Sequence, residues 1–430
     1  MNNRSTGLYP GPVIKKQFGG FRRPSVTTLV LLLGAVCILA LDFKSFEREG
    51  GSTAQAFLVA GSVFFGGLFV WRVQIETRFR APKTLVLRAL FLWLIYLGFS
   101  IIPVLVWDVD LGQYGRVLIP YLLFGLGLLL VLAADQHRLD PLLLIDMLVL
   151  GAILSSLWRF FYVVQIAELP MDTMRNQILA PGVLVLLGYG VGGFYLKRRK
   201  KLAAICLLIF TIVAILSVTR TLLISLVAVV TGLLAVETAR RRAGTALQKT
   251  IRYMGSFFLL AVVGYFLAAV LRPDVVQHWE TRLFVQETGS GIDITLRSRL
   301  AEWKGQVDAI SQDISSAVLG RGLGSVVEWD TELLEGTPWE MEDKENWFGG
   351  HSSWIYHFYA HGMFVGWIMP YLLMFTLILG YKSSIRREPG RFRDVSVLSF
   401  LIYIAYFGAS FTVNIFTERY NGIILGVICG

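Results

Sequence analysis

The chain has 430 residues, of which 55% are hydrophobic and 16% charged, with a mean hydropathy of +0.61 and a net charge of +10. Apolar runs of about 18 to 22 residues recur along it, and each is long enough to cross a hydrocarbon core about 30 Å thick. This composition excludes a soluble multidomain protein and indicates an all-α polytopic membrane protein.

Hydropathy predicts about twelve transmembrane helices. The first follows about 24 polar and basic residues without a small-residue cleavage pattern, so we expect an uncleaved anchor and no removed signal peptide. The last is short, which predicts an incomplete final helix or a truncated chain. The predicted spans are 25–41, 53–71, 84–106, 117–134, 141–160, 178–196, 202–218, 221–236, 253–271, 356–381, 394–414 and 420–430.

The connections between these spans sort by charge. Alternate connections hold 25 of the 40 Lys and Arg residues, most visibly Lys197–Lys201 and Arg240–Arg242. The positive-inside rule makes these connections cytoplasmic, together with the basic N-terminus 1–24 and the C-terminal end. We interpret the basic clusters as topology signals with some affinity for anionic lipids, and not as nucleic-acid sites.

One long connection, residues 272–350, has the opposite charge. It contains 15 of the 30 acids and only 7 Lys or Arg, a net charge of about −8. The predicted topology places it on the outer side, between nine spans in residues 25–271 and three spans in residues 351–430. We therefore expect an external loop whose surplus carboxylates are solvated.

Two arginines stand among apolar residues near the same outer surface. Arg220 occupies a tight hairpin, Thr219-Arg220-Thr221, and Arg159 lies in "SSLWRFF" near the outer end of the fifth span. Because an arginine at this depth is expensive in lipid, each either snorkels to the headgroups or faces a polar cavity.

The external loop contains a predicted amphipathic helix. Its apolar residues recur at spacings of three and four, while charged residues such as Glu302 occupy the other faces. We expect this helix to lie along the membrane surface or to pack over the spans. Arg299 falls on its first turn, where the helix dipole favours an anion. The apolar stripe comprises Leu296, Leu300, Trp303, Val307, Ile310 and Ile314.

A glycine-rich segment follows this helix. Gly320-Arg321-Gly322-Leu323-Gly324-Ser325 lacks the Lys-Ser/Thr ending and the preceding strand of a phosphate-binding loop. The pattern therefore predicts a sharp structural bend and not a nucleotide site.

Histidines mark the entry to the tenth span. His351 comes at a predicted helix start at the outer surface, where Ser352 or Ser353 can cap the helix. His357 and His361 are four residues apart but have no Cys or carboxylate beside them, which favours packing or hydrogen bonding inside the bundle over metal binding. The three cysteines all lie in apolar runs and indicate neither a disulfide framework nor a metal site: Cys37, Cys206 and Cys429.

The C-terminal half, from about Ile205, contains four motifs in order: "SVTRTLL", "RSRLAEW", "VLGRGLGS" and "HSSWIYHFYAHGMFVG". This ordered set resembles the O-antigen ligase and polymerase superfamily of bacterial envelope enzymes. His351-Ser352, followed after nine residues by Gly362, resembles the ligase signature, whereas the tail at Val365-Gly366 departs from it. Ligase is the preferred interpretation, and polymerase stays open.

The resemblance implies a metal-independent glycosyltransferase without a cofactor, in the bacterial inner membrane, with its site facing the periplasm. The donor would be a glycan on undecaprenyl diphosphate, and the acceptor a sugar hydroxyl of lipid A–core or of another lipid-linked glycan. The diphosphate-binding role maps onto Arg220 and Arg299, and the catalytic role onto His351. Candidate supporting residues are Arg321, Arg159, Trp303 and Glu302.

The chemistry favours these residue types independently of the resemblance. Guanidinium groups stay charged and bind phosphate oxygens in pairs, so they can stabilise a diphosphate leaving group. A neutral imidazole can accept the proton of an attacking sugar hydroxyl. Direct attack would invert the anomeric centre.

Other interpretations compete with this one. Arg299 and Arg321 could ion-pair with the surplus acids, and His351 could be a polar residue at a helix start. A lipid-linked glycan transporter or a non-catalytic assembly protein would share the composition. However, transporters concentrate charged residues near the membrane midplane, whereas here the candidate residues gather at one surface.

Overall fold

The computed structural model describes residues 21–42, 53–77, 84–163, 178–217, 219–240, 294–327, 329–335, 350–386 and 390–430, with isolated residues between 255 and 276. The regular structure within these ranges is helical throughout. Seven helices are long and apolar enough to cross a membrane, or eight if one bent pair is a single span. The expectation of an α-helical membrane protein is confirmed, whereas most of the ninth predicted span, 253–271, lies outside the described residues.

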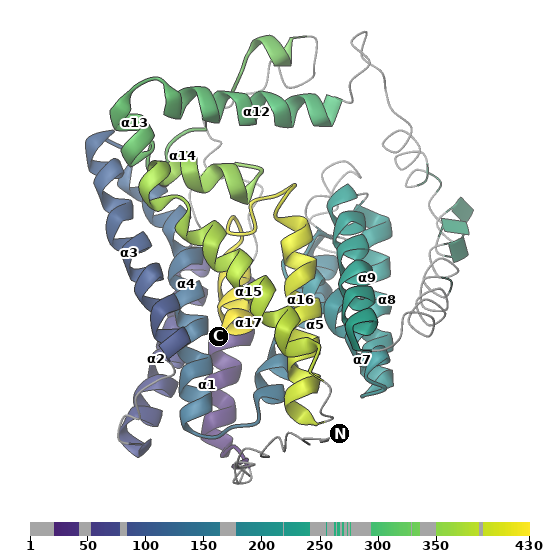
Figure 1. Ribbon diagram of the computed structural model, residues 1–430. Helices are drawn as coiled ribbons and strands as arrows, with labels where there is room; N and C mark the ends of the chain where they lie inside the picture. Colours follow the sequence, from purple (N-terminus) through teal and green to yellow (C-terminus); the bar gives the residue numbers. More distant parts are fainter. Residues whose placement is uncertain are drawn as a thin grey trace, which may run out of the picture.

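The helices of the N-terminal half stand side by side as a bundle (Figure 1). α3, α5 and α8 follow their predicted spans within two residues, whereas α2 ends six residues later and α4 begins six residues earlier than predicted. Asp110 and Asp140 accept hydrogen bonds from backbone N–H groups of the turns they precede, which fixes where α4 and α5 begin. The elements are α1 (Val26–Cys37), η1 (Ile38–Leu41), α2 (Thr53–Thr77), α3 (Thr84–Val106), α4 (Leu111–Gln136), α5 (Pro141–Phe161), α7 (Val183–Tyr195), α8 (Lys200–Ser217) and α9 (Arg220–Arg240).

The tenth predicted span, 356–381, is not one straight helix. The chain forms α14 (Ser353–Val365) and α15 (Ile368–Ser384), which meet at 109°. The bend arises because the glycine turn after α13 (Ile314–Leu319) presses its backbone onto α14. Arg321 N–H donates to Tyr359 O at 2.7 Å, and Gly322 N–H donates to Ala360 O at 3.0 Å.

Glycine is required on both sides of this contact. Gly320 and Gly362 both have positive φ, at 76° and 66°. A Cβ on Gly320 would lie 2.5 Å from the backbone nitrogen of His361, and a Cβ on Gly362 would lie 2.7 Å from that of Gly320. The predicted bend at Gly320–Gly324 therefore exists, and it also ends the regular part of α14.

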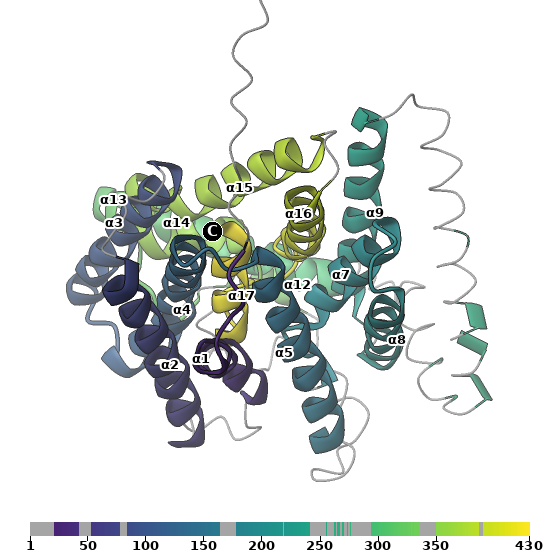
Figure 2. The ribbon, with the colours of Figure 1, turned by 90° about the horizontal axis from the view of Figure 1, so that it is seen from below.

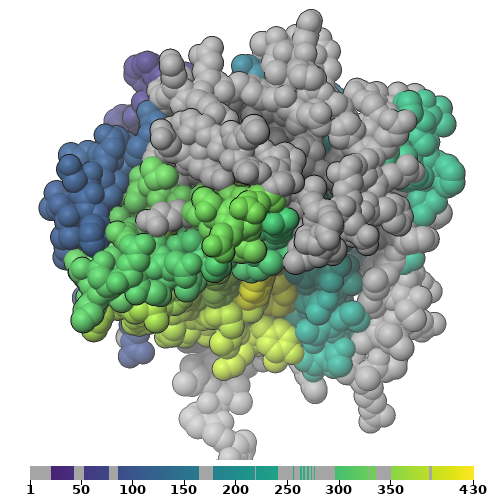
Figure 3. Space-filling model, turned by 90° about the horizontal axis from the view of Figure 1, so that it is seen from above, coloured from purple at the N-terminus to yellow at the C-terminus, as the bar shows by residue number. Residues whose placement is uncertain are grey.

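The predicted amphipathic helix divides into α12 (Ile294–Ser311) and α13, and α12 lies across one end of the bundle (Figures 1 and 3). It packs over the other helices as expected, but only in part through the apolar stripe: Ile310 packs against the core, whereas Leu296 and Val307 stay 48% and 46% exposed. Its buried face consists of small and polar residues: Ser298, Ala301, Glu302, Gln306 and Ala309. α12 begins at Ile294, so Arg299 falls in its second turn. The prediction that Arg299 lies on the first turn, where the helix dipole favours an anion, is therefore wrong.

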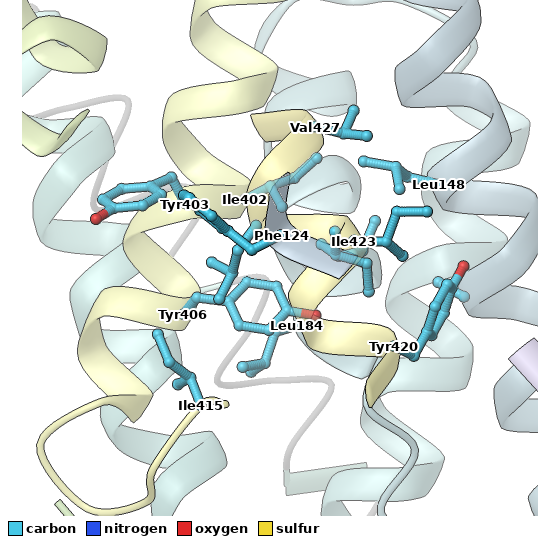
Figure 4. Close-up of a cluster of buried hydrophobic side chains, with 14 of the residues drawn as sticks. Phe124, Leu148, Leu184, Ile402, Tyr403, Tyr406, Ile415, Tyr420, Ile423 and Val427 are labelled. Atoms are coloured by element: carbon cyan, nitrogen blue, oxygen red, sulfur yellow. The ribbon is translucent and has the colours of Figure 1, made fainter. Parts of the chain in front are cut away.

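The last two helices form the centre of the bundle. α16 (Arg391–Ala409) ends five residues before the predicted boundary, and the short α17 (Arg419–Cys429) lies surrounded by α1, α4, α5 and α16 (Figure 2). Phe124 of α4 belongs to a buried cluster that also includes Leu148 of α5, Leu184 of α7, Ile402 of α16 and Ile423 of α17 (Figure 4). Gly422 and Gly426, four residues apart on α17, face the backbone of Pro120 and Phe124. Small residues thus let α4 and α17 approach closely.

We predict that Gly426→Ala destabilises the bundle, because the added methyl would overlap the Phe124 carbonyl oxygen and lie 2.9 Å from the Gly127 Cα. The expected loss is about 1–3 kcal/mol, the usual cost of overpacking. Thermal unfolding followed by fluorescence-detected size exclusion measures it. Gly67→Ala on α2 is the matched control, because a Cβ there meets nothing within 4 Å. An equal melting temperature for both variants would contradict the packing account.

Candidate active site beneath α12

The loop between α16 and α17, residues 410–418, lies at the end of the bundle that α12 covers. Both boundaries differ from the prediction, which assigned Ser410–Asn414 to a span. Polar residues are frequent in this loop, and side chains of α5, α9, α12 and α14 make hydrogen bonds to it. We call it the 410–418 loop.

Arg299 and the start of α9 meet at Thr412 of this loop. Arg299 Nη1 donates to the Thr412 carbonyl oxygen. The hydroxyl of Thr221 lies 2.9 Å from the hydroxyl of Thr412. Because Arg220 is the first residue of α9 and directly precedes Thr221, this contact brings the Arg220 backbone to the same point as the Arg299 guanidinium.

The start of α14 is fastened to the same loop. Ser353 N–H donates to Ser410 O at 3.2 Å, and the Ser353 hydroxyl accepts from Ile415 N–H at 3.0 Å. Trp354 Nε1 donates to the Ser410 hydroxyl at 3.0 Å. Ser352 occupies the N-cap position of α14 but makes no side-chain capping bond, so the predicted serine cap is replaced by bonds to the loop.

His351 pairs with Glu302 on the buried face of α12. Its backbone N–H donates to Glu302 Oε1 at 2.5 Å, and its ring Nδ1 bonds to Glu302 Oε2. Gln306 Nε2 adds a third donor to the carboxylate, at 2.9 Å. A carboxylate without a proton only accepts hydrogen bonds, so Nδ1 is the donor to it in this pair, and in a neutral ring the lone pair would then lie on Nε2.

Burial divides this pair into an inner and an outer partner. The Glu302 side chain has no exposed surface, whereas the His351 side chain keeps 27% of its own. A buried carboxylate needs several donors to offset lost hydration, and here the three come from one histidine and one glutamine. The imidazole is thus held from inside and presented toward the surface, with Trp329 edge-on to it at 6.1 Å between ring centres.

A glycine allows the chain to approach Glu302 this closely. Gly350 has a φ of 60°, and a Cβ there would lie 3.2 Å from Glu302 Oε1 and 2.9 Å from the Tyr356 ring. The backbone before α14 can therefore turn His351 back onto α12.

Charge near this pair is mixed. Arg299 and Glu302 are three residues apart on α12, on neighbouring faces of consecutive turns. Burial lowers the pKa of the Arg299 guanidinium from its ordinary value, and the Glu302 charge partly offsets that shift. A guanidinium nevertheless stays protonated at neutral pH, so a permanent cation lies beside the histidine–carboxylate pair.

The candidate supporting residues have different surroundings. Arg159 is 3% exposed and donates to Leu179 O at 2.6 Å and to Glu418 Oε2 at 3.4 Å. Snorkelling is therefore wrong for Arg159, which anchors the far end of the 410–418 loop. Arg321 stacks over Trp107 at 4.8 Å and donates to Ala309 O at 3.1 Å, so it braces the glycine turn.

Trp303 and the two inner histidines complete the set. Trp303 is half-buried on α12, and its buried Nε1 has no hydrogen-bond partner within the described part of the chain. His357 and His361 are fully buried; His357 Nδ1 lies 2.9 Å from the Tyr96 hydroxyl, and His361 stacks on the Tyr96 ring. The structure thus places both inside the bundle, where packing was predicted.

Sequence reasoning missed two features of this site. The first half of the 410–418 loop, Ser410–Asn414, was absorbed into a predicted span, although the close succession of Ser410, Thr412 and Asn414 is unusual for a lipid-facing helix end. Glu302 was considered only as one supporting acid, because helical periodicity assigned the burial to the apolar stripe beside it.

A scan against models of known protein families finds no match, and a search of curated proteins finds none either. The assignment of a function therefore depends on the residues of this chain and their geometry.

We predict that Glu302→Ala destabilises the site, because the His351 amide and the Gln306 side chain would lose their buried acceptor. One unsatisfied buried donor costs about 1–3 kcal/mol. Thermal unfolding and faster hydrogen exchange of the His351 amide would report the loss. Asp308→Ala, at an exposed position of the same helix, should change stability by no more than about 0.5 kcal/mol. Equal protection of the His351 amide in both variants would contradict the assigned bond.

Proposed function

We propose that the chain is an inner-membrane glycosyltransferase that moves a glycan from undecaprenyl diphosphate to a sugar hydroxyl on the periplasmic side. One observation carries the proposal: a surface-facing histidine is held by a buried carboxylate, one helical turn from an arginine that is anchored to the 410–418 loop. General base, orienting acid and phosphate-binding cation are the groups that such a transfer needs.

His351 is the general base in this mechanism. Glu302 accepts the Nδ1 proton and so sets the tautomer, which leaves the Nε2 lone pair to take the proton of the acceptor hydroxyl. The carboxylate also stabilises the imidazolium that forms during the attack. Because Glu302 acts through His351 and does not touch the substrate, it is a positioning residue.

Arg299 and Arg220 bind the diphosphate of the donor. Both come from segments that meet at Thr412, so two guanidinium groups can approach one diphosphate from α12 and from α9. The lipid tail would remain in the bilayer below, since α9 is itself a candidate membrane span. Trp303, with its buried indole N–H, is a further donor on the flank of α12.

The bonds and charges balance without another reactant. The acceptor oxygen forms a bond to the anomeric carbon as the bond from that carbon to the diphosphate oxygen breaks. The departing diphosphate keeps the electron pair, which Arg220 and Arg299 stabilise, and the acceptor proton moves to His351. A single displacement of this kind inverts the anomeric centre.

The acceptor preferred here is a sugar of lipid A–core, which makes the protein an O-antigen ligase. The His351-Ser352 and Gly362 spacing supports this choice, and each of these residues has a role at the site entry. His351 binds Glu302, Ser352 is the N-cap of α14, and Gly362 permits the bend. Polymerisation of lipid-linked repeats is the alternative.

The test is reconstitution of purified protein with a lipid-linked glycan and either acceptor, without added metal. We expect His351→Ala to abolish transfer at unchanged protein abundance. Arg220→Ala and Arg299→Ala should lower transfer and weaken inhibition by free polyprenyl diphosphate. Arg297→Ala is the matched control, since Arg297 lies on a different face of α12, two residues from Arg299.

Two results would overturn the proposal. Normal transfer by His351→Ala would remove the base, and unchanged inhibition in both arginine variants would remove the diphosphate site. Transfer that disappears with a chelator would refute the metal-independent mechanism. The roles of His351, Arg220 and Arg299 would still be tested by the same variants.

We further predict that Glu302→Gln lowers the transfer rate by about 10²- to 10⁴-fold, as loss of an orienting carboxylate does in other histidine-dependent enzymes. The glutamine amide can donate to Nδ1 and so favour the tautomer whose Nε2 is protonated. The apparent affinity for the donor should change little, because Glu302 makes no contact with the diphosphate. Glu302→Asp should restore part of the rate. A lost donor affinity with an intact maximal rate would contradict a positioning role.

A further inference from the structure

A cavity of about 270 Å³ opens at the end of the bundle opposite to α12. Its lining residues come from the first half of α5, the first half of α16, and α7 with the turn that follows it. These three helices are neighbours in the view from below (Figure 2). This is the basic end of the molecule, which the positive-inside pattern makes cytoplasmic. The cavity is separate from the candidate active site and shares no residue with it.

The lining combines both signs of charge with an apolar floor. Three ion pairs are involved: Arg199 with Asp146 at 2.7 Å, Arg391 with Asp140 at 2.9 Å, and Arg198 with Asp394 at 2.8 Å. All of these residues except Asp394 line the cavity directly. The floor is formed by Leu142, Leu143, Leu398, Tyr189 and Pro24.

The arginines keep capacity for a ligand. The side chains of Arg199 and Arg391 remain 53% and 54% exposed, and each ion pair uses Nη1 of a group with five N–H donors. Arg199 also bonds to the Tyr189 hydroxyl, and Arg391 also lies over the Phe21 ring at 5.7 Å, which leaves further N–H donors on each guanidinium. The two carboxylate oxygens of Asp140 have different partners: Oδ1 accepts from Leu142 N–H at the start of α5, and Oδ2 accepts from Arg391. The carboxylates are about a quarter exposed, so they too can accept from a ligand.

The backbone at this cavity is strained. Lys197 and Arg199 have positive φ values of 55° and 43°, which non-glycine residues rarely adopt. The turn that joins α7 and α8 is therefore held in an unfavourable form that directs Arg199 onto Asp146. Such outliers often occur at ligand sites.

We propose that this cavity binds the headgroup of a phosphatidylethanolamine molecule in the adjacent leaflet. The lipid phosphate would bind Arg199 and Arg391, and the ammonium would donate to Asp146 and Asp140. The leucine floor would contact the start of the acyl chains. The volume lies just below the range of about 300–1,000 Å³ typical of small-molecule pockets, which suits a headgroup.

The mixed charge is what selects this lipid class. Phosphatidylglycerol would bring an anion without a partner for the two carboxylates. Phosphatidylcholine has the same charges, but its quaternary nitrogen has no N–H to donate to Asp146. The inference is independent of the glycosyltransferase proposal and requires only that the chain lies in a membrane.

The test is native mass spectrometry of the purified chain after exchange into equimolar phosphatidylethanolamine, phosphatidylglycerol and phosphatidylcholine. We expect one phosphatidylethanolamine retained per chain, with preference falling as the headgroup nitrogen is methylated step by step. This series uses the unmodified protein, so its outcome does not depend on whether a variant folds.

Substitutions then locate the site. Asp146→Asn should reduce the preference for phosphatidylethanolamine over phosphatidylcholine about tenfold, which corresponds to about 1.4 kcal/mol for one charge-assisted hydrogen bond. Arg199→Gln should lower retention of all three phospholipids. Glu76→Gln is the matched control, because Glu76 pairs with Arg72 at 2.8 Å on the surface of α2, outside the cavity.

Three outcomes would refute the inference. Equal retention of the three lipids, or a preference for phosphatidylglycerol, would show that the cavity does not select phosphatidylethanolamine and acts only as a basic surface. An effect of Glu76→Gln as large as that of Asp146→Asn would show that the lipid does not bind specifically at this cavity. Complete displacement of the lipid by soluble phosphoethanolamine at low concentration would identify a free phosphomonoester as the ligand and refute lipid binding.

Discussion

The buried carboxylate of Glu302 is the constraint on which the arrangement of the candidate site depends. A fully buried acid is tolerated only when several donors surround it, and the nearest donors are the His351 backbone, the His351 ring and Gln306. To supply them, the chain must reverse at Gly350 and approach α12 within hydrogen-bond distance. The path into α14 and the contact of His351 Nδ1 with α12 thus follow from one requirement. The same bonds that satisfy the acid also present the imidazole to the surface.

A second constraint fixes where that pair stands relative to the membrane helices. The glycine turn after α13 bonds to the carbonyls of Tyr359 and Ala360 and bends the chain by 109° between α14 and α15. With the bend, α14 stays at the bundle end, where Ser353 and Trp354 bond to the 410–418 loop. Two glycines in contact, Gly320 and Gly362, therefore help to position residues that lie far from them in sequence.

The sequence predicts much of this fold and less of the site, for physical reasons. Hydropathy locates α3, α5 and α8 almost to the residue, because span length follows from the thickness of the membrane. It misplaces the end of α16 and predicts 356–381 as one span, since an apolar run says nothing about a bend imposed by distant backbone. Periodicity also missed the most buried face of α12, because its fully buried residues are Ala301, Glu302 and Ala309, whereas of the larger apolar residues Leu296 and Val307 stay exposed. The pairing of Glu302 with His351 joins residues 49 positions apart, which no local pattern encodes.

The anchoring of Arg299 has a consequence for how the proposed site would meet a diphosphate. Its bond to the Thr412 carbonyl oxygen immobilises a long side chain before any ligand arrives, so binding need not supply that ordering entropy. Only one terminal nitrogen is engaged in that bond, and a guanidinium carries five N–H donors. Arg220 approaches the same residue through Thr221, on a different helix. A diphosphate at this point would therefore meet one preorganised cation, Arg299 of α12, close to the backbone of a second arginine at the start of α9, and the proposed base His351 would be held beside them by the buried Glu302. Preorganised charge of this kind stabilises a developing anion far better than mobile side chains or water, because little must reorient as the bond breaks.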